Sequence, residues 1–229
     1  MRPRPRVTNP RAVPVAGHDA HLPAVPPECL APEALRRRFA HPPEWTPEKR
    51  GDGGQFAGYP RTRASVLVPL VLRDDGLTLL LTQRTAHLRD HAGQISFPGG
   101  REEAHDADAV DTALREAQEE VGLARRHVEV IGTLPVYRTV TNFDVTPVVA
   151  LVSPEFELAL DAHEVAEAFE VPFAFLMTPA HHRRHVYEFE GVEREFLSMP
   201  YPRPDGQGEY FIWGATAAML RNFYRLLSA

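Results

Sequence analysis

The sequence predicts an α+β fold in which a mixed β-sheet lies between α-helices. Apolar stretches of strand length and amphipathic stretches of helix length are mixed along the chain. Several expected strands follow one another through short, hairpin-like turns, which favours this class over a doubly wound parallel sheet. Hydrophobic residues make up 43% of the 229 residues, so a sizeable core can form.

The N-terminal segment differs in composition from the rest of the chain. Residues 1–32 are rich in proline and arginine and show no apolar periodicity, so we expect a mobile or loosely docked tail. Residues 33–229 are expected to form a single domain. This domain begins with a short helix at 33–40, and a loop rich in proline and glycine follows it.

The centre of the chain contains the clearest elements. The apolar run 64–72 predicts a buried strand, and 77–84 predicts its partner across the turn Asp74-Asp75-Gly76. A polar loop then leads to a helix at about 108–121. Gly122 is expected to end that helix, because glycine readily adopts the left-handed conformation found just past helix ends.

The C-terminal part of the chain is expected to alternate strands and helices. Residues 164–172 fit a helix or a strand, but Pro172 and the alternation of apolar residues favour a strand. The other expected elements are strands at 127–136 and 144–152, a short helix at 173–177, a hairpin at 186–199 and a helix at 215–227. The last helix should bury Met219, Leu220, Phe223, Leu226 and Leu227.

Composition excludes several classes of protein. The net charge of −6 argues against a protein that binds nucleic acid over its whole surface. Cys29 is the only cysteine, which excludes an internal disulfide and a CxxC metal site. The longest apolar run, 65–72, is too short to span a bilayer, and no secretory signal is recognisable. We therefore expect a cytoplasmic protein without nucleic-acid or membrane partners, either a monomer or a homodimer.

Three glutamates gather on the helix predicted at 108–121. Glu116, Glu119 and Glu120 are three and four residues apart, so their side chains are neighbours on one arc. Like charges so placed destabilise a bare helix by about 0.2–0.5 kcal/mol per pair. A bound divalent cation reverses that effect, because hard cations take oxygen ligands. A solvated acidic helix face is the alternative interpretation of the same residues.

A diglycine turn precedes the acidic helix and favours the metal-binding interpretation. In Phe97-Pro98-Gly99-Gly100, the two glycines allow the backbone to approach a ligand closely, and a carbonyl there can supply another oxygen. Arg115 is expected to have a structural role, pairing its forked guanidinium with one glutamate and orienting it.

The spacing of these residues resembles the Nudix box. The matching run is Gly100-x5-Asp106-x8-Arg115-Glu116-Ala117-x-Glu119-Glu120-x-Gly122-Leu123. The half that begins at Arg115 matches in full. The first half departs, because one extra residue separates the acid from the arginine and the acid is aspartate. Asp106 and Asp108 therefore compete for that acidic position.

A second resemblance is to the coenzyme A pyrophosphatase branch of the Nudix hydrolases. Its signature is similar to Leu80-Leu81-Thr82-Gln83-Arg84-Thr85-x3-Arg89-x3-Gly93-x3-Phe97-Pro98-Gly99-Gly100. Thr85 departs from the serine or alanine of that signature. The ending Trp213-Gly214-Ala215-Thr216-Ala217 also resembles this branch.

These resemblances imply a Nudix-type sheet between helices and a specific reaction. The reaction is hydrolysis of the diphosphate bond of coenzyme A, with Mg²⁺ or Mn²⁺, to 3′,5′-ADP and 4′-phosphopantetheine. The implied metal ligands are Glu116, Glu119, Glu120 and the carbonyl of Gly100. The implied substrate-binding residues are Arg84, Arg89 and Gly99, with Arg115 and Gly122 in structural roles. Glu119 and Glu120 are the implied catalytic residues, and Glu164 and Glu167 are further candidates for the general base.

Other interpretations stay open at this point. The chain is compatible with a Nudix hydrolase of ADP-ribose, NADH or an oxidised nucleotide, or with a catalytically silent module that senses a nucleotide or a coenzyme A derivative. The cluster His181, His182 and His185 invites a zinc hypothesis, but no HExxH and no cysteine partner accompany it. We expect these histidines to lie in a surface loop.

Overall fold

The computed structural model describes residues 7, 9–52, 61–87, 93–189 and 191–229. Its helices are α1 (Pro32–Ala40), α2 (Ala109–Val121), α3 (Phe173–Leu176) and α4 (Gly214–Leu227), with short 3₁₀ turns at Pro10–Ala12, Pro27–Leu30, Arg125–His127 and Pro179–His181. Its strands are β1 (Val15–His18), β2 (Thr62–Arg73), β3 (Gly76–Arg84), β4 (Ile95–Ser96), β5 (Gly99–Arg101), β6 (Val128–Thr133), β7 (Tyr137–Arg138), β8 (Phe143–Val152), β9 (Val165–Pro172), β10 (Arg183–Phe189), β11 (Val192–Pro202) and β12 (Glu209–Trp213).

The larger sheet is mixed, as the sequence predicted. Within the described residues it has eight strands, with the central order β4-β3-β2-β8-β6, while β5, β7 and β9 pair with β2, β8 and β3. Strands β2 and β8 run parallel and the other pairs are antiparallel. The chain segment between β2 and β8 contains α2, because parallel neighbours need a long crossover connection. The predicted α+β class is confirmed.

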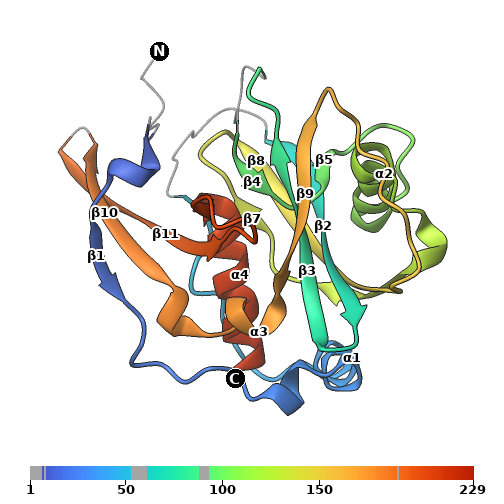
Figure 1. The fold of residues 1–229 in the computed structure, drawn as a ribbon, viewed down its shortest axis with the longest axis horizontal. Helices are drawn as coiled ribbons and strands as arrows, with labels where there is room; N and C mark the ends of the chain where they lie inside the picture. The colour runs from blue at the N-terminus through green and yellow to red at the C-terminus, as the bar shows by residue number, and fades with distance from the viewer. Residues whose placement is uncertain (1–6, 8, 53–60, 88–92, 190) are drawn as a thin grey trace.

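Both faces of this sheet are covered (Figure 1). On one face, Ala113, Ala117 and Val121 of α2 pack against a set of strand residues, which are Leu67, Val71, Leu80, Val148, Ala150 and Val152. On the other face, the alternate strand residues join a second core cluster with α3 and α4. The continuous apolar run of β2 follows from this arrangement, because a strand buried on both faces cannot alternate with polar residues.

A second, four-stranded sheet in the order β1-β10-β11-β12 packs on the far side of α4 (Figure 1). The sequence predicted only the β10–β11 hairpin of this sheet. Residues 15–18, expected within a tail, instead form β1 and pair with β10. Val25 and Leu30 of the same segment are buried in the core. Local composition gave no sign of this docking, because the partner strand lies at the other end of the chain.

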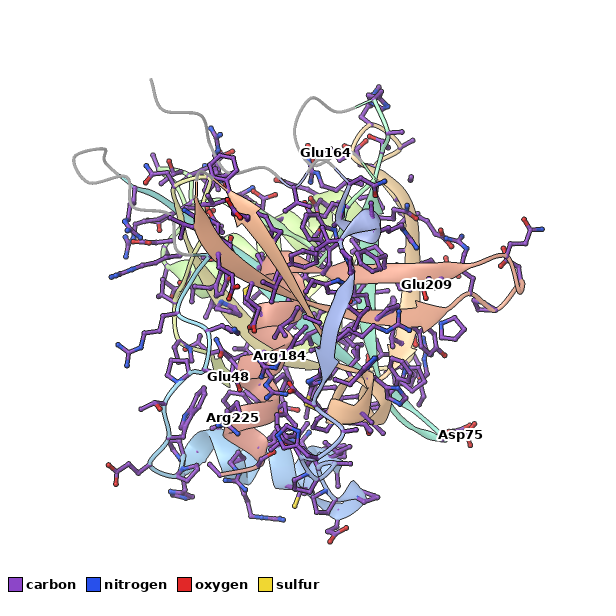
Figure 2. The ribbon with its side chains drawn as sticks, turned by 90° about the vertical axis from the view of Figure 1, so that its left-hand side faces the viewer. Glu48, Asp75, Glu164, Arg184, Glu209 and Arg225 are labelled. Carbon is purple, nitrogen blue, oxygen red and sulfur yellow. The ribbon has the colours of Figure 1, made fainter. Side chains whose placement is uncertain are left out.

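A buried ionic network fastens the N-terminal segment to α4. Asp19 is 2% exposed, and it accepts a 2.8 Å hydrogen bond from Nε of Arg184. Arg221 is 1% exposed, and its Nη1 lies 3.0 Å from Oδ2 of Asp19. That contact lacks the geometry of a hydrogen bond, so charge attraction holds it. Glu48 joins the network through Arg184 and Arg225, and these three side chains gather beside α4 (Figure 2).

The prediction of a surface loop is wrong for two of the three histidines, whereas His181 is exposed at the end of the 3₁₀ turn Pro179–His181. His182 and His185 are fully or almost fully buried. His182 lies 2.8 Å from the carbonyl of Leu176 and contacts Arg221, while His185 is hydrogen-bonded to Ser198. Burial lowers the pKa of His182 to about 4, so this ring is neutral at physiological pH. His182 therefore joins the packing between α3 and α4, and His185 joins the core of the second sheet.

Candidate active site

A cleft of 1500 Å³ opens between the two sheets. Its walls come from β2, β3, β5, α2 and β10–β12, and they include Gly99, Gly100 and Glu116 on one side and Tyr187, Phe196 and Trp213 on the other. Ordinary small-molecule pockets have volumes of about 300–1,000 Å³. The cleft therefore has room for a ligand that is longer than a diphosphate alone.

Helix α2 positions the glutamates at this cleft. The Asp108 side chain caps the N-terminus of the helix by accepting a hydrogen bond from the Asp111 amide. Gly122 ends the helix in the left-handed conformation, with φ at 72°. Between these caps, the apolar arc of the helix fixes its rotation against the sheet. Glu120 is consequently 5% exposed, and the Gly99 amide donates a 3.1 Å hydrogen bond to its Oε2.

The electrostatics of the two inward glutamates favour a bound cation. Burial raises the pKa of Glu120 to about 7, against the opposing effects of the Gly99 hydrogen bond and the charge of Arg84. Burial also raises the pKa of Glu116, although Arg115 opposes it. Repulsion from Glu116 and Glu164 further raises the pKa of Glu120, and repulsion from Glu119 and Glu164 further raises that of Glu116. A divalent cation between them would remove this repulsion and the cost of burying charge.

Arg115 orients the glutamates from behind the cleft. Its Nε and Nη2 donate to both oxygens of Asp106 at 2.8 and 3.0 Å, and its Nη1 donates to Glu116 and Glu119 at 3.0 and 2.9 Å. The hydrogen bonds from Arg115 hold the pKa of Asp106 well below its usual range. Asp106 is thus the partner of Arg115, while Asp108 is the helix cap. The extra residue in the sequence pattern does not disturb either role.

The structure separates Glu119 from the other two glutamates. Its side chain is 59% exposed and pairs with Arg115, whereas Glu116 and Glu120 face the diglycine turn. Across the described part of the chain, no group of three His, Cys, Asp or Glu side chains is arranged to hold a metal ion. The pair Glu116 and Glu120 still suits Mg²⁺, which takes one or two carboxylates and completes its shell with water and substrate phosphates.

Gly100 is required by the close approach of Glu116. A Cβ atom at Gly100 would lie 2.5 Å from the Glu116 carboxyl carbon, whereas one at Gly99 would meet the Ser65 carbonyl oxygen at 2.4 Å. We expect Gly100→Ala to displace a flexible carboxylate, lowering kcat/KM about 100-fold, as a 1 Å misplacement can. Its thermal midpoint should change little.

The matched variant is Gly99→Ala, whose added Cβ atom would clash with the backbone of β2 instead of with a side chain. It should lower the free energy of unfolding by about 1–3 kcal/mol, the usual cost of overpacking. Kinetics and thermal melts of the two variants test the distinction. Equal destabilisation by both would contradict it.

The predicted loop residues have different surroundings. Nη1 of Arg84 lies 3.6 Å from Oε1 of Glu120, and its Nη2 lies 3.4 Å from Oε2 of Glu164. Arg84 and Glu164 therefore lie at the same candidate site as Glu120. Glu167 lies apart from them, paired with Arg203 at 2.8 Å and hydrogen-bonded to the Tyr210 hydroxyl. Arg89 lies outside the described residues. The cleft wall from the second sheet was missed at the sequence level, because its aromatic residues come from three separate strands.

Comparison with known proteins identifies the family. The family model described as the NUDIX domain matches residues 61–190, more than half of the chain. This protein belongs to the Nudix family. The Nudix domain assigned by that match includes β2 to β10 and all five glutamates of the predicted site. Strands β11 and β12 and helix α4 lie beyond it.

Curated relatives agree with the assignment, and solved structures of lower similarity also match the chain. Proteins named "Uncharacterized Nudix hydrolase NudL" from Salmonella paratyphi B and Salmonella newport are each 44% identical over 160 residues, which cover 69% of this chain and 79% of the relative. A Nudix hydrolase from M. smegmatis, RenU, is 23% identical over 49% of this chain and 71% of its own, with a TM-score of 0.44. A MutT/nudix family protein from Enterococcus faecalis is 16% identical over 86% of this chain and 75% of its own, with a TM-score of 0.45.

Among the described residues, no helix is long and apolar enough to cross a membrane.

Proposed function

We propose that this Nudix hydrolase cleaves the diphosphate bond of coenzyme A or its derivatives, giving 3′,5′-ADP and 4′-phosphopantetheine. The observation that carries the proposal is the pair of inward carboxylates, Glu116 and Glu120, against the diglycine turn of a large cleft. Several described residues of the coenzyme A pyrophosphatase signature line that cleft, among them Gln83, Arg84, Gly93 and Phe97. Arg84 ends β3, and Gly99 and Gly100 form β5, so the signature lines the same cleft as the Nudix box.

Glu116 and Glu120 would hold Mg²⁺ or Mn²⁺, with Glu119 at the edge and the Gly100 carbonyl as a further oxygen. When bound, such an ion neutralises phosphate charge and lowers the pKa of a coordinated water. The chain itself orients the carboxylates, through Arg115 for Glu116 and through the Gly99 amide for Glu120. Arg84 is placed to bind a phosphate oxygen, because substrate can exchange for its long contacts with Glu120 and Glu164.

Glu164 is the better placed of the two loop candidates for the general base. It lines the cleft, and its side chain is 48% exposed, so water can reach it. Its charge also raises the pKa of Glu116 and Glu120, which places it in their electrostatic field. Glu167, in contrast, is engaged by Arg203 and Tyr210. We therefore retain Glu164 as the candidate to accept a proton from the attacking water.

A substrate panel tests the proposed function. Purified protein with millimolar Mg²⁺ or Mn²⁺ is expected to release 3′,5′-ADP and 4′-phosphopantetheine from coenzyme A, identified by mass spectrometry. ADP-ribose, NADH and an oxidised nucleotide serve as competitors, and kcat/KM for coenzyme A should exceed theirs by at least about tenfold, or 1.4 kcal/mol. A higher value for a competitor would reassign the substrate. Binding of coenzyme A without product release would indicate a sensing module.

A further inference from the structure

One arginine at the cleft differs from its neighbours in having no acidic partner. The described residues that line the cleft include four arginines, which are Arg11, Arg84, Arg101 and Arg203. Three of them are ion-paired: Arg11 with Glu209, Arg84 with Glu164 and Arg203 with Glu167. Arg101 forms no ion pair within the described residues. An exposed guanidinium without a counter-ion at a ligand cleft is available for an anionic ligand.

The backbone of Arg101 is tied to the candidate metal-binding residues. Arg101 ends β5, directly after Gly100, and its backbone pairs with Ala64 of β2. Its carbonyl oxygen accepts a 3.0 Å hydrogen bond from Nη2 of Arg115, the same side chain that holds Glu116. The position of the Arg101 Cα atom is therefore fixed relative to the carboxylates of Glu116 and Glu120.

An aromatic ring supports the guanidinium itself. The central guanidinium carbon of Arg101 lies 5.2 Å from the centroid of the Phe143 ring, and Phe143 also lines the cleft. A cation over a ring face is attracted to it, which restricts the rotamers of a long side chain. The Arg101 guanidinium donates no hydrogen bond within the described residues. Its N–H donors match the geometry of phosphate oxygens.

Charge balance gives this cation a role. Glu116, Glu120 and Glu164 gather on one side of the cleft, and Arg84 is partly neutralised by two of them. The metal ion proposed above would offset Glu116 and Glu120, and further cations would balance the remaining phosphate charges of the substrate. Arg101 is the cleft arginine whose charge no described carboxylate offsets.

We propose that Arg101, supported by the Phe143 ring, is a binding residue for a phosphate oxygen of the substrate's diphosphate. The identity of that substrate rests on the proposed function above. The binding of a phosphate oxygen by Arg101 does not depend on that identity, because any substrate with a diphosphate presents such oxygens. Arg101 acts in substrate binding rather than in activating the attacking water.

The kinetic test compares Arg101→Ala, Arg101→Lys and Phe143→Leu with the wild-type protein on coenzyme A. Arg101→Ala should raise KM about 10- to 100-fold, the range that a hydrogen bond to a charged group contributes, with kcat lowered less than about threefold. Lysine should restore part of the affinity, because it keeps the charge but loses the fork. Phe143→Leu should raise KM by a smaller factor, since the cation remains and only its support is lost. A KM within about twofold of wild type for Arg101→Ala would overturn the proposal.

Arg126→Ala is the matched control. Arg126 is an exposed arginine outside the cleft, so its removal changes the net charge equally. Its KM should equal that of the wild type, and thermal melts of all variants should coincide to within about 2–4 °C, the shift for 1 kcal/mol in a protein of this size. An equal rise of KM in Arg126→Ala would assign the effect to overall charge and overturn the proposal.

Calorimetry with inorganic pyrophosphate and Mg²⁺ separates this inference from the proposed function. If the wild type does not cleave coenzyme A, the proposed substrate fails, while pyrophosphate binding still tests Arg101. We expect Arg101→Ala to bind pyrophosphate at least about tenfold more weakly than the wild type does. Equal affinities, or no measurable binding by the wild type, would overturn the inference.

Discussion

Replacing Glu120 with glutamine is expected to lower kcat/KM at least about 100-fold, because even partners outside the ligand shell of a metal contribute 10- to 100-fold. The change keeps the shape of the side chain and its hydrogen bond from the Gly99 amide, but it removes the charge that would hold the cation. The measurement is steady-state hydrolysis of the best substrate of the panel. An unchanged rate would refute a metal-binding role for Glu120.

The same substitution should stabilise the metal-free protein. Burial raises the pKa of Glu120 from 4.5 to about 7, so the folded protein retains a proton that the unfolded chain has lost. Below pH 4.5 the Glu120 carboxyl is protonated in both the folded and the unfolded state, so its burial carries no charge penalty. The stability that this protonated side chain allows is lost as the pH rises through about 7. In EDTA at about pH 8, Glu120→Gln should therefore raise the free energy of unfolding by up to roughly 3 kcal/mol, with little difference at about pH 4.

Glu119→Gln provides the control on the same helix. Its side chain is 59% exposed, so it should leave the metal-free stability nearly unchanged at either pH. Denaturant unfolding in EDTA measures both variants. A stability gain for Glu119→Gln equal to that of Glu120→Gln would show that overall charge, and not burial, is responsible. Added Mg²⁺ should raise the thermal midpoint of the wild type more than that of Glu120→Gln, since only the wild type keeps both carboxylates.

Replacing Asp19 with alanine is expected to cost about 3–5 kcal/mol, the usual effect of removing one partner from a buried ion pair. Arg221 would be left charged at 1% exposure, with Glu48 as its remaining acidic contact. Burial alone would raise the pKa of Asp19, but the Arg184 hydrogen bond and the charge of Arg221 outweigh it and lower the pKa. The ionised pair thus stabilises the protein at neutral pH, and the difference from alanine should shrink as the pH falls below about 4.

Denaturant unfolding of Asp19→Ala measures this effect, and an exposed ion pair supplies the control. Arg36 and Glu129 are bonded to each other with 34% and 52% of their side chains exposed. Glu129→Ala should change the free energy of unfolding by less than about 1 kcal/mol. A loss below about 1 kcal/mol for Asp19→Ala would show that the buried ion pair contributes little to stability. Arg221→Met tests the other partner and should destabilise by a similar amount.

The parts of the fold that were predicted correctly are those with local signals. The β2–β3 hairpin was marked by two apolar runs around an Asp-Asp-Gly turn, and α2 by its apolar arc and Gly122. The carboxylates of the candidate site were proposed from a signal of the same kind, because all three glutamates lie within five residues of one helix. Strand β9 was favoured over a helix by its alternation, and it pairs with β3.

The parts that were not predicted depend on partners far along the chain. Strand β1 is held by β10, and the burial of Asp19 depends on Arg184 and Arg221. No periodicity within residues 15–19 could indicate these partners. The buried histidines were assigned to the surface for the same reason, since their polar groups are satisfied by hydrogen bonds to residues of other elements.

The sequence by itself determined the helix, its end at Gly122 and the presence of three neighbouring glutamates, because each depends on residues within about one or two turns of backbone. Gly99 and Gly100, expected as a turn, instead form β5, because they pair with β2. Only the tertiary structure decided which of those glutamates face the cleft. Packing of the apolar arc on the sheet sets the rotation of α2, so Glu120 is buried, Glu116 meets Gly100 and Glu119 is left at the edge with Arg115. It also brought the second sheet to the opposite wall, because strand pairing and burial join segments that local spacing cannot relate.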